Sequence, residues 1–255
     1  MTDSKIQNIL SCKGARPVVE VTAYDYPSAR LLDDAGVDIL LVGDSLGMMM
    51  LGLPDTTGVT LAHMLHHTEA VARAKTKALL VADLPIHTYD TPEQALQTAR
   101  ALVNAGAEAV KLEGGVDKAA HISAIVQAGI PLQAHIGLLP QKIKEDGGYR
   151  MRGKTEEEAA ALMADLASVV QAGAFSVVIE CTSAAVAAKL TAASPIITIG
   201  IGAGHGTCDG EVQVFHDLVG GFPWFVPRFA APAAHIAADI TRAAKDWAAT
   251  LRLPE

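Results

Sequence analysis

The chain has 255 residues, half of them hydrophobic and 19% charged, which is enough apolar material for a large buried core. Its formal net charge is −8 and it has no basic run, which argues against nucleic acid as a partner. The three cysteines match neither a zinc site nor a disulfide framework. No apolar run approaches the roughly 20 residues that span a bilayer, and no signal-peptide core follows Met1. We therefore expect a cytoplasmic protein with no membrane partner.

Apolar strands alternate with helices along the whole chain. After a short helix at residues 6–10, the sequence predicts strands at 17–23, 38–44, 78–83, 107–113, 131–136, 175–180, 195–199 and 224–226. Helices are predicted at 26–35, 61–75, 92–104, 117–127, 155–171, 183–192, 212–218 and 231–250. Strands that are apolar on both faces belong to a parallel sheet covered by helices. Eight such units predict an α/β fold, a (β/α)8 TIM barrel in which residues 1–255 form a single domain with a short N-terminal helix and a C-terminal helical tail.

Two helix starts and two long polar loops stand out. Thr91 precedes a proline and Thr155 precedes three glutamates, which are typical N-terminal caps. The loops at 47–60 and 140–154 are long enough to suggest a role over a site, and Gly147 and Gly148 would let the second move as a lid. The second loop is also basic, either as solvated charge or as a contact for an anionic cofactor tail.

Polar residues recur where the predicted strands end. Asp44, Asp83, Glu113 and Glu180 follow or end the second, third, fourth and sixth strands. Lys111 lies two residues before Glu113 and therefore shares a strand face with it. Because a barrel of this kind collects its functional groups at the carboxyl ends of its strands, we expect these side chains to converge.

Three acids with no cysteine form a hard, oxygen-rich site of the kind that suits Mg²⁺. A fourth acid further round the barrel is free to act as a base. The chemistry suggested is removal of a proton next to a carbonyl, with the metal stabilising the enolate. The alternative is that each acid caps a helix or binds backbone amides at a turn. That explanation suffices for one acid, but it is less economical for four acids and a lysine at one end of successive strands.

Other features allow two interpretations each. His63, His66 and His67 have the spacing of a helix surface, although histidines four residues apart can bind a metal. His135 ends a strand, where it could orient a substrate, neutralise an acid or be purely structural. The glycine-rich segment at 200–206 predicts a tight turn with positive φ, with phosphate binding as the other possibility.

Several long motifs resemble those of the ketopantoate (3-methyl-2-oxobutanoate) hydroxymethyltransferase family. They occur in the family's order from about residue 15 to residue 220, which makes the resemblance specific. In this sequence they are VTAYDYPSA at 21–29, VGDSLGM at 42–48, VKLEGG at 110–115, HIGL at 135–138, PQ at 140–141, GGY at 147–149, GIGAG at 200–204 and DG at 209–210. Three loops depart from the family pattern, after the third, fifth and seventh strands.

The resemblance implies a (β/α)8 barrel and a defined reaction. It implies transfer of a one-carbon unit from 5,10-methylenetetrahydrofolate to 3-methyl-2-oxobutanoate, giving 2-dehydropantoate for pantothenate biosynthesis. By motif match, the Mg²⁺ ligands would be Asp44, Asp83 and Glu113, and the general base would be Glu180. The ketoacid would be held by Ser45 and Lys111 together with Asp44 and Asp83. The resemblance also implies a homo-oligomer, a homodecamer in the family.

Two rival functions remain open from the sequence. One is a related metal-dependent enzyme that forms an enolate and breaks a carbon–carbon bond on the same barrel, which folate dependence would distinguish. Cys181 follows Glu180 directly and should face away from it, and no nucleophilic cysteine motif is present. The other is a non-catalytic assembly or regulatory subunit, which turnover would exclude.

Overall fold

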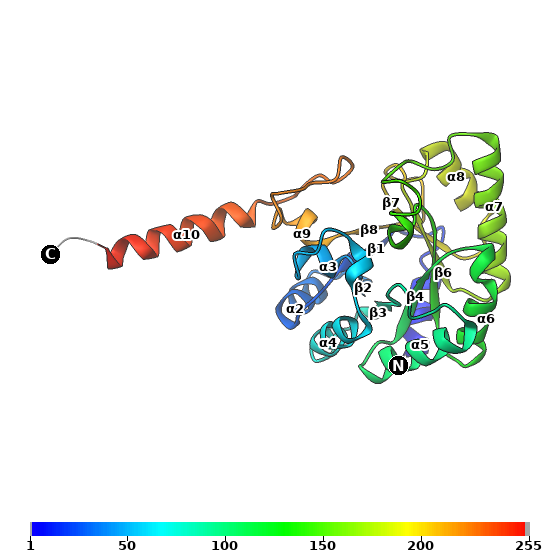
Figure 1. Cartoon of the computed structure of the whole chain (residues 1–255), viewed down its shortest axis with the longest axis horizontal. Helices are drawn as coiled ribbons and strands as arrows, with labels where there is room; N and C mark the ends of the chain where they lie inside the picture. Colours follow the sequence, from blue (N-terminus) through cyan, green and yellow to red (C-terminus); the bar gives the residue numbers. More distant parts are fainter. Residues whose placement is uncertain (1, 253–255) are drawn as a thin grey trace. The chain divides into compact units, whose positions relative to one another are not determined.

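Eight parallel strands close into a barrel in the computed structural model, which describes residues 2–252 (Figure 1). The strands follow one another around the barrel in sequence order. Their bounds are β1 Val18–Thr22, β2 Ile39–Val42, β3 Leu79–Asp83, β4 Ala109–Glu113, β5 Leu132–Gly137, β6 Ser176–Glu180, β7 Ile197–Ile201 and β8 Gly210–Gln213. The predicted (β/α)8 barrel is therefore confirmed.

Helices alternate with the strands and lie outside the sheet (Figure 1). The longer ones are α1 Thr2–Leu10, α2 Tyr26–Asp34, α4 Leu61–Ala72, α5 Pro92–Asn104, α6 Ala119–Gln127, α7 Glu156–Gln171, α8 Ala184–Ala193 and α10 Ile236–Leu251. Both predicted caps are present. The side chain of Thr91 accepts a hydrogen bond from the backbone N–H of Gln94 at 3.2 Å, and Thr155 accepts one from Glu158 at 3.1 Å.

The eighth strand is not where the sequence predicted it. Residues 224–226 lie outside any strand and Trp224 is 81% exposed, whereas β8 begins at Gly210, inside a segment predicted as turn and helix. A Cβ on Gly210 would lie 2.3 Å from the carbonyl oxygen of Val18 on β1, so only glycine allows this close approach. With one buried aliphatic residue, Val212, the strand lacks the apolar run that marks the others.

Structured turns occupy the two long loops. The loop after β2 contains α3 Leu46–Met49 and η1 Thr56–Gly58, and the loop after β5 begins with η3 Pro140–Lys142. Between β7 and β8, Gly202, Gly204 and Gly206 all have positive φ, as expected for a tight turn. In the part of the chain that the structure describes, no helix has the length and apolarity needed to cross a membrane.

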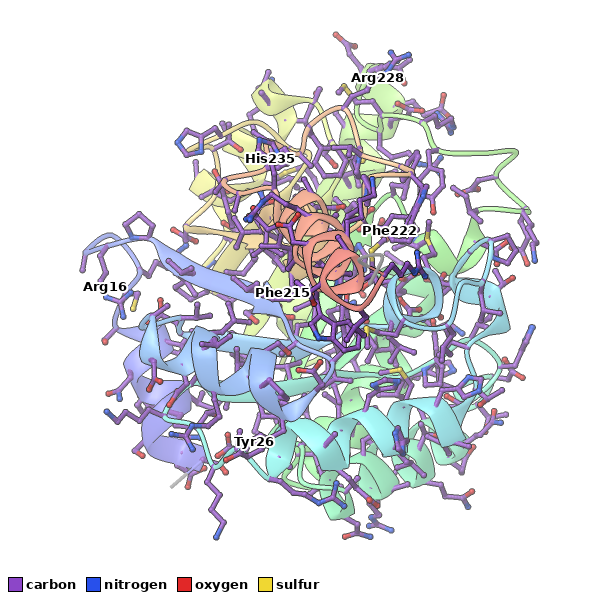
Figure 2. All side chains as sticks on the ribbon, turned by 90° about the vertical axis from the view of Figure 1, so that its left-hand side faces the viewer. Arg16, Tyr26, Phe215, Phe222, Arg228 and His235 are labelled. Carbon is purple, nitrogen blue, oxygen red and sulfur yellow. The ribbon has the colours of Figure 1, made fainter. Side chains whose placement is uncertain are left out.

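The chain divides into two compact units, one ending at Val212 and the other beginning at Gln213. The second unit contains α9 Phe215–Leu218 and α10, and its Phe222 and Trp224 rings pack edge to face. Figure 2 shows the side chains of both units, with Phe222 among those labelled in the second. That the barrel and its helical tail form one domain stays a prediction.

An apolar core fills the barrel interior at the amino-terminal ends of the strands. Ile6 and Ile9 of α1 pack against strand residues such as Ile39 and Leu79. One acid lies in this interior: Glu20 of β1 is fully buried, and its carboxylate accepts a hydrogen bond from Nε2 of Gln133 at 2.9 Å. Burial is the main reason that the pKa of Glu20 is raised to about 7, and the Gln133 hydrogen bond opposes the shift.

We expect the stability of the metal-free protein to fall with rising pH partly because of Glu20. Between about pH 4.5 and 7 the carboxyl ionises in the unfolded chain but stays protonated in the fold, so its contribution is lost as the pH rises through about 7. The shift corresponds to an effect of about 3 kcal/mol. Glu20→Gln should flatten this part of the profile and stabilise the protein above pH 7, measured by urea denaturation. A profile unchanged by Glu20→Gln would contradict the assignment.

Candidate active site

The barrel brings the predicted acids and lysine to the carboxyl ends of its strands. Asp83, Glu113 and Glu180 are the last residues of β3, β4 and β6, and Asp44 lies two residues beyond β2. Lys111 lies at the middle of β4, next to Asp83 in the register of the sheet. The predicted convergence at one end of the barrel is therefore confirmed.

A buried ion pair forms the centre of the site. Nζ of Lys111 lies 2.5 Å from Oδ1 of Asp83, and both side chains are at most 5% exposed. Burial opposes a charged ammonium, but the carboxylates of Asp83, Glu113 and Asp44 together raise the pKa of Lys111 above its ordinary value. Lys111 is therefore a permanent cation that can face a developing negative charge.

The site holds more buried acid than this one cation balances. Burial, reinforced by the Asp83 carboxylate, raises the pKa of Asp44 to about 7. Burial and the charge of Asp44 likewise raise the pKa of Glu113 well above its ordinary range. These carboxyls resist ionisation because too little positive charge is nearby. A divalent cation would supply that charge and favour their ionised form.

The acidic groups fit an open magnesium site, in which water and substrate complete the shell, better than a site closed by protein ligands alone. In residues 2–252, no three His, Cys, Asp or Glu side chains converge on a point as a preformed metal site. Mg²⁺ typically keeps several waters and takes one or two carboxylates plus oxygens of the substrate. An all-oxygen, incomplete protein shell therefore suits it, and the ligand roles of Asp44, Asp83 and Glu113 stay a prediction.

Backbone geometry at the end of β2 orders the acids. The backbone N–H of Asp44 donates to Oδ2 of Asp83 at 3.0 Å. The tight neighbour of Gly43 is Ser45: a Cβ at position 43 would lie 3.0 Å from Oγ of Ser45 and only at ordinary contact distance, 3.5 Å, from Oδ2 of Asp83. Ser45 is half-buried, and its hydroxyl is hydrogen-bonded to the phenol of Tyr24 at 2.8 Å.

His135 lies between two of the acids. Its Nε2 is 3.2 Å from Oε2 of Glu180, and its Nδ1 is 3.6 Å from Oε1 of Glu113 and 3.5 Å from Nζ of Lys111. Because an ammonium only donates, Nδ1 accepts and Nε2 carries the hydrogen that faces Glu180. Burial and the Lys111 charge lower the pKa of His135, so the ring is neutral. The ring lies beside two acids, but Nε2 forms no well-aligned hydrogen bond, so the choice among the roles open from the sequence stays a prediction.

The sequence interpretation missed Gln141 as a site residue. It follows β5 in η3, is 4% exposed, and its side-chain Nε2 donates to Oδ2 of Asp44 at 2.8 Å. Its amide oxygen accepts from the hydroxyl of Tyr89, which belongs to the loop after β3. Its position directly after Pro140 in a short motif was the only signal in the sequence, since a lone glutamine in a polar loop has no periodicity.

The cations of the basic loop after β5 form ion pairs. Four of them pair with acids, and three of these four side chains are at least 40% exposed, in agreement with the expectation of solvated charges, while a contact to an anionic cofactor tail stays a prediction. These pairs are Lys142 with Asp117, Lys144 with Asp55, Arg150 with Glu158 and Arg152 with Asp146. The Lys144–Asp55 pair, at 3.2 Å, joins this loop to the loop after β2.

The three neighbouring histidines have local roles. His63 completes a capping box with Thr60 at the start of α4, and Nδ1 of His67 lies 2.6 Å from the carbonyl oxygen of Tyr24. Neither contact is with a metal-binding group, in agreement with the helix-surface prediction.

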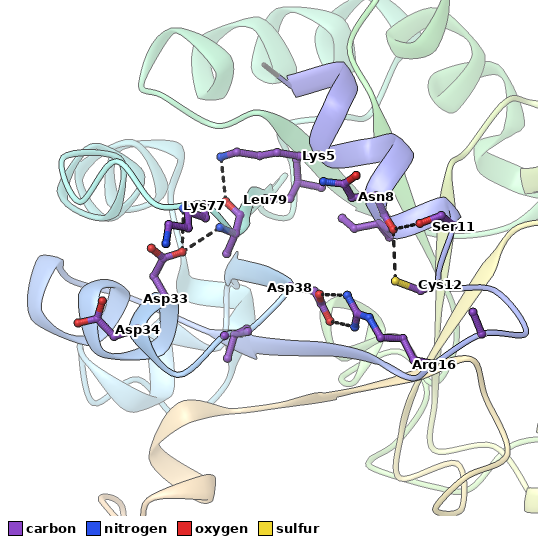
Figure 3. A pocket seen from close by; sticks show the side chains of 15 residues that line it. Lys5, Asn8, Ser11, Cys12, Arg16, Asp33, Asp34, Asp38, Lys77 and Leu79 are labelled. Atoms are coloured by element: carbon purple, nitrogen blue, oxygen red, sulfur yellow. Dashed lines mark hydrogen bonds and ion pairs between the residues drawn. The ribbon is translucent and has the colours of Figure 1, made fainter.

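A cavity of about 730 Å³ lies at the opposite end of the barrel (Figure 3). It is lined by α1 and by residues that immediately precede β2 and β3. Its charged groups already have partners: Arg16 makes two hydrogen bonds to the carboxylate of Asp38, and Lys5 pairs with Glu108 at 2.6 Å. This cavity contains none of the predicted site residues.

Comparison with known proteins gives consistent matches. The model of the family described as ketopantoate hydroxymethyltransferase matches residues 3–253. The 3-methyl-2-oxobutanoate hydroxymethyltransferase of Pyrobaculum islandicum is 51% identical over 241 residues, which cover 94% of this chain and 92% of that protein. The protein of the same name from Moorella thermoacetica is 50% identical over 222 residues, covering 86% and 82% of the two chains.

Solved structures show the same barrel at low sequence identity. A putative phosphonomutase from Burkholderia cenocepacia has a TM-score of 0.67 at 22% identity, covering 84% of this chain and 92% of that one. A phosphonopyruvate hydrolase in complex with oxalate and Mg²⁺ has a TM-score of 0.63 at 13% identity, covering 83% and 81%. These likenesses establish the fold alone. The family model and the half-identical relatives, which span nearly the whole chain, show that the chain belongs to the ketopantoate hydroxymethyltransferase family.

Proposed function

We propose that this transferase moves a hydroxymethyl group from 5,10-methylenetetrahydrofolate to 3-methyl-2-oxobutanoate, giving 2-dehydropantoate for pantothenate biosynthesis. Family membership supports the reaction, and one observation of the site carries it: a permanent cation, Lys111, lies among buried carboxylates at the mouth of the barrel. A small 2-oxo acid needs a positive group near its oxygens and a base near its acidic carbon, and the site offers both.

The ketoacid is held by groups that the fold has already oriented. Ser45 and Lys111 bind its carboxylate and carbonyl region, together with Asp44 and Asp83. The Tyr24 phenol, 2.8 Å from Oγ of Ser45, fixes the serine hydroxyl. The ion pair with Asp83 fixes the ammonium of Lys111. Binding therefore needs little reorganisation of these side chains.

Glu180 acts as the general base. It removes the proton from C3 of the ketoacid, and the electron pair of that bond moves toward the carbonyl oxygen, which faces Lys111. Nε2 of His135 lies 3.2 Å from Oε2 of Glu180, beside the carboxylate that takes the proton. The carbon nucleophile then bonds to the methylene carbon of the folate as one of its two carbon–nitrogen bonds breaks. Water supplies the hydroxyl group to the same carbon as the second carbon–nitrogen bond breaks, and tetrahydrofolate leaves with one proton from C3 and one from water. Mg²⁺, held by Asp44, Asp83 and Glu113, would withdraw electron density from the carbonyl when bound.

The carbon–carbon lyase alternative is less well supported. A lyase that used a cysteine nucleophile would need a reactive thiolate, but burial and the adjacent Glu180 raise the pKa of Cys181 to about 12. The fold does not separate the two functions, because the solved neighbours include a 2,3-dimethylmalate lyase. Folate dependence remains the distinguishing property, and turnover distinguishes either enzyme from a scaffold.

We also propose that the protein assembles as a cytoplasmic homo-oligomer, a decamer as in its family, without nucleic-acid or membrane partners. Helix α10 supports the assembly, because no side chain of its own compact unit buries any of its described residues. Ile240, Trp247 and Leu251 are each at least 64% exposed, and their spacing of seven and four residues aligns them on one face. A second copy of the chain is the partner that would cover this apolar stripe.

Glu180→Gln should abolish chemistry without unfolding the barrel. The amide keeps the shape of the carboxylate but cannot accept the C3 proton, so we expect both product formation and exchange of that proton into D₂O to fall by about two to four orders of magnitude. NMR of 3-methyl-2-oxobutanoate without folate measures the exchange alone. Cys181→Ala is the neighbouring control and should retain most activity. Exchange at the parent rate in Glu180→Gln would remove Glu180 as the base.

Removal of divalent metal should stop both half-reactions. With excess EDTA we expect neither proton exchange nor ketopantoate, and added Mg²⁺ should restore both, because the buried acids are then neutralised and the carbonyl is polarised. Exchange without product in the Mg²⁺ enzyme would instead indicate a different one-carbon donor. Turnover unaffected by EDTA would refute the metal dependence.

Charge on the apolar stripe of α10 should disrupt assembly. The double variant Ile240→Glu, Trp247→Glu places two carboxylates on the face that a second copy would cover, so light scattering coupled to gel filtration should show smaller species. Lys245→Glu, which changes charge on the opposite face of the same helix, is the matched control. Equal masses for all three proteins would argue against α10 as an interface.

A further inference from the structure

Gln141 makes an unusual number of contacts for a loop residue. It is 4% exposed, and its amide nitrogen donates to Oδ2 of Asp44 at 2.8 Å and to the carbonyl oxygen of Leu84 at 3.0 Å. Its amide oxygen accepts from the hydroxyl of Tyr89. Both amide hydrogens and the oxygen are thus used, which is how a buried primary amide avoids a desolvation cost.

These partners fix the orientation of the Gln141 amide. Rotating the amide by 180° would place its oxygen against two acceptors, the Asp44 carboxylate and the Leu84 carbonyl, which is repulsive. The Tyr89 hydroxyl holds the oxygen on the other side. The donor that reaches Asp44 therefore has one stable position, set by the loops after β3 and β5.

The main chain of the same residue reaches a second acid. The backbone N–H of Gln141 donates to Oε2 of Glu113 at 3.1 Å. One residue thus holds one carboxylate oxygen of Asp44, which follows β2, and one of Glu113, which ends β4. The other oxygen of Asp44, Oδ1, is left for a different partner.

The chemistry of this donor matters for the neighbouring acids. A lysine or arginine in the same place would neutralise Asp44 and compete with a metal ion for it. A neutral amide fixes the carboxylate while leaving its negative charge in place. Mutation of a group that holds a metal ligand in this way typically lowers the metal affinity by about 10- to 100-fold.

We infer that Gln141 is a positioning residue that fixes the carboxylates of Asp44 and Glu113 to receive a divalent cation, and that Tyr89 locks its amide. This inference rests on the proposed metal-dependent function. It differs from the ligand assignment, because Gln141 does not itself bind the metal. It assigns a role to the loops after β3 and β5, which together supply the amide and its lock.

The direct test is the affinity for Mn²⁺, followed by the electron paramagnetic resonance signal of the free ion. Gln141→Met keeps an unbranched side chain of similar size but no donor, and should bind Mn²⁺ about 10- to 100-fold more weakly than the parent. Tyr89→Phe keeps the amide but removes its lock, and should show a smaller loss of at least about threefold. Near-ultraviolet circular dichroism checks that each variant is folded.

A matched control is available in the same barrel. Gln133 is also buried and hydrogen-bonded, but its partners are Glu20 and Ser176, which are not predicted metal ligands. Gln133→Met should lower the melting temperature yet leave Mn²⁺ affinity within about twofold of the parent, since it removes no contact to Asp44 or Glu113. Saturating Mg²⁺ should also restore most of the kcat of Gln141→Met, which a general folding defect would not allow.

The outcomes separate this inference from the proposed function. Parent-like Mn²⁺ affinity in folded Gln141→Met overturns the inference, and so does a loss of equal size in Gln133→Met. If Gln141→Met does not fold, parent-like affinity in folded Tyr89→Phe overturns it instead. A parent protein that binds no Mn²⁺ overturns both the inference and the metal site. If Gln141→Met binds Mn²⁺ more weakly than the parent, but the parent catalyses no hydroxymethyl transfer, the inference is supported and the proposed reaction is refuted.

Discussion

The buried ion pair between Lys111 and Asp83 is the interaction on which the rest of the site depends. Removing one member of such a pair leaves an uncompensated charge in a low-dielectric interior, at a typical cost of about 3–5 kcal/mol. The pair is itself weak evidence for stability, because two apolar side chains of similar volume could fill the same space. Its position among further acids, Asp44 and Glu113, makes sense as a device for binding charge. The acids outnumber the cation, and the excess negative charge is what a divalent ion would use.

Neutral donors organise the acids that the lysine does not reach. His135 faces Glu180, the backbone of Asp44 holds Asp83, and Gln141 holds Asp44 and Glu113. Each of these groups orients a carboxylate without removing its charge. The arrangement therefore combines a high density of acidic groups with little freedom of rotation, which is the condition for preorganised electrostatic catalysis once a cation is bound. Strands supply the ion pair of Lys111 with Asp83, and the loops add the contacts of Gln141.

The two ends of the barrel differ in what they do with charge. At the amino-terminal end, α1 closes the apolar interior, and the charged groups around the cavity there, such as Arg16 and Asp38, are paired with one another. At the carboxyl end, charge is left partly unbalanced. In barrels of this kind the amino-terminal end serves stability, whereas the side chains at the carboxyl end determine the chemistry. Belonging to the fold is therefore uninformative about the reaction, and the side chains at the mouth decide it.

Local patterns along the chain were sufficient to predict the barrel, most element bounds and the end of the barrel at which the acids meet. Strands that are apolar on both faces, helix caps at Thr91 and Thr155, and polar residues at strand ends are local signals, so they can be recognised without a structure. The eighth strand was misplaced because Gly210–Gln213 carries almost no apolar signal. The strand forms because Gly210 comes close to β1, which is a contact between the last and the first strand of the barrel.

Only the tertiary structure decided how the acids are held. The ion pairs of the basic loop, the place of His135 between two carboxylates and the contacts of Gln141 each join segments far apart in the chain. Gln141 and Asp44 are 97 residues apart, and nothing in either segment marks the other as its partner. Local propensity acts over a few residues, whereas these hydrogen bonds exist only because closure of the barrel brings loops from separate strands together.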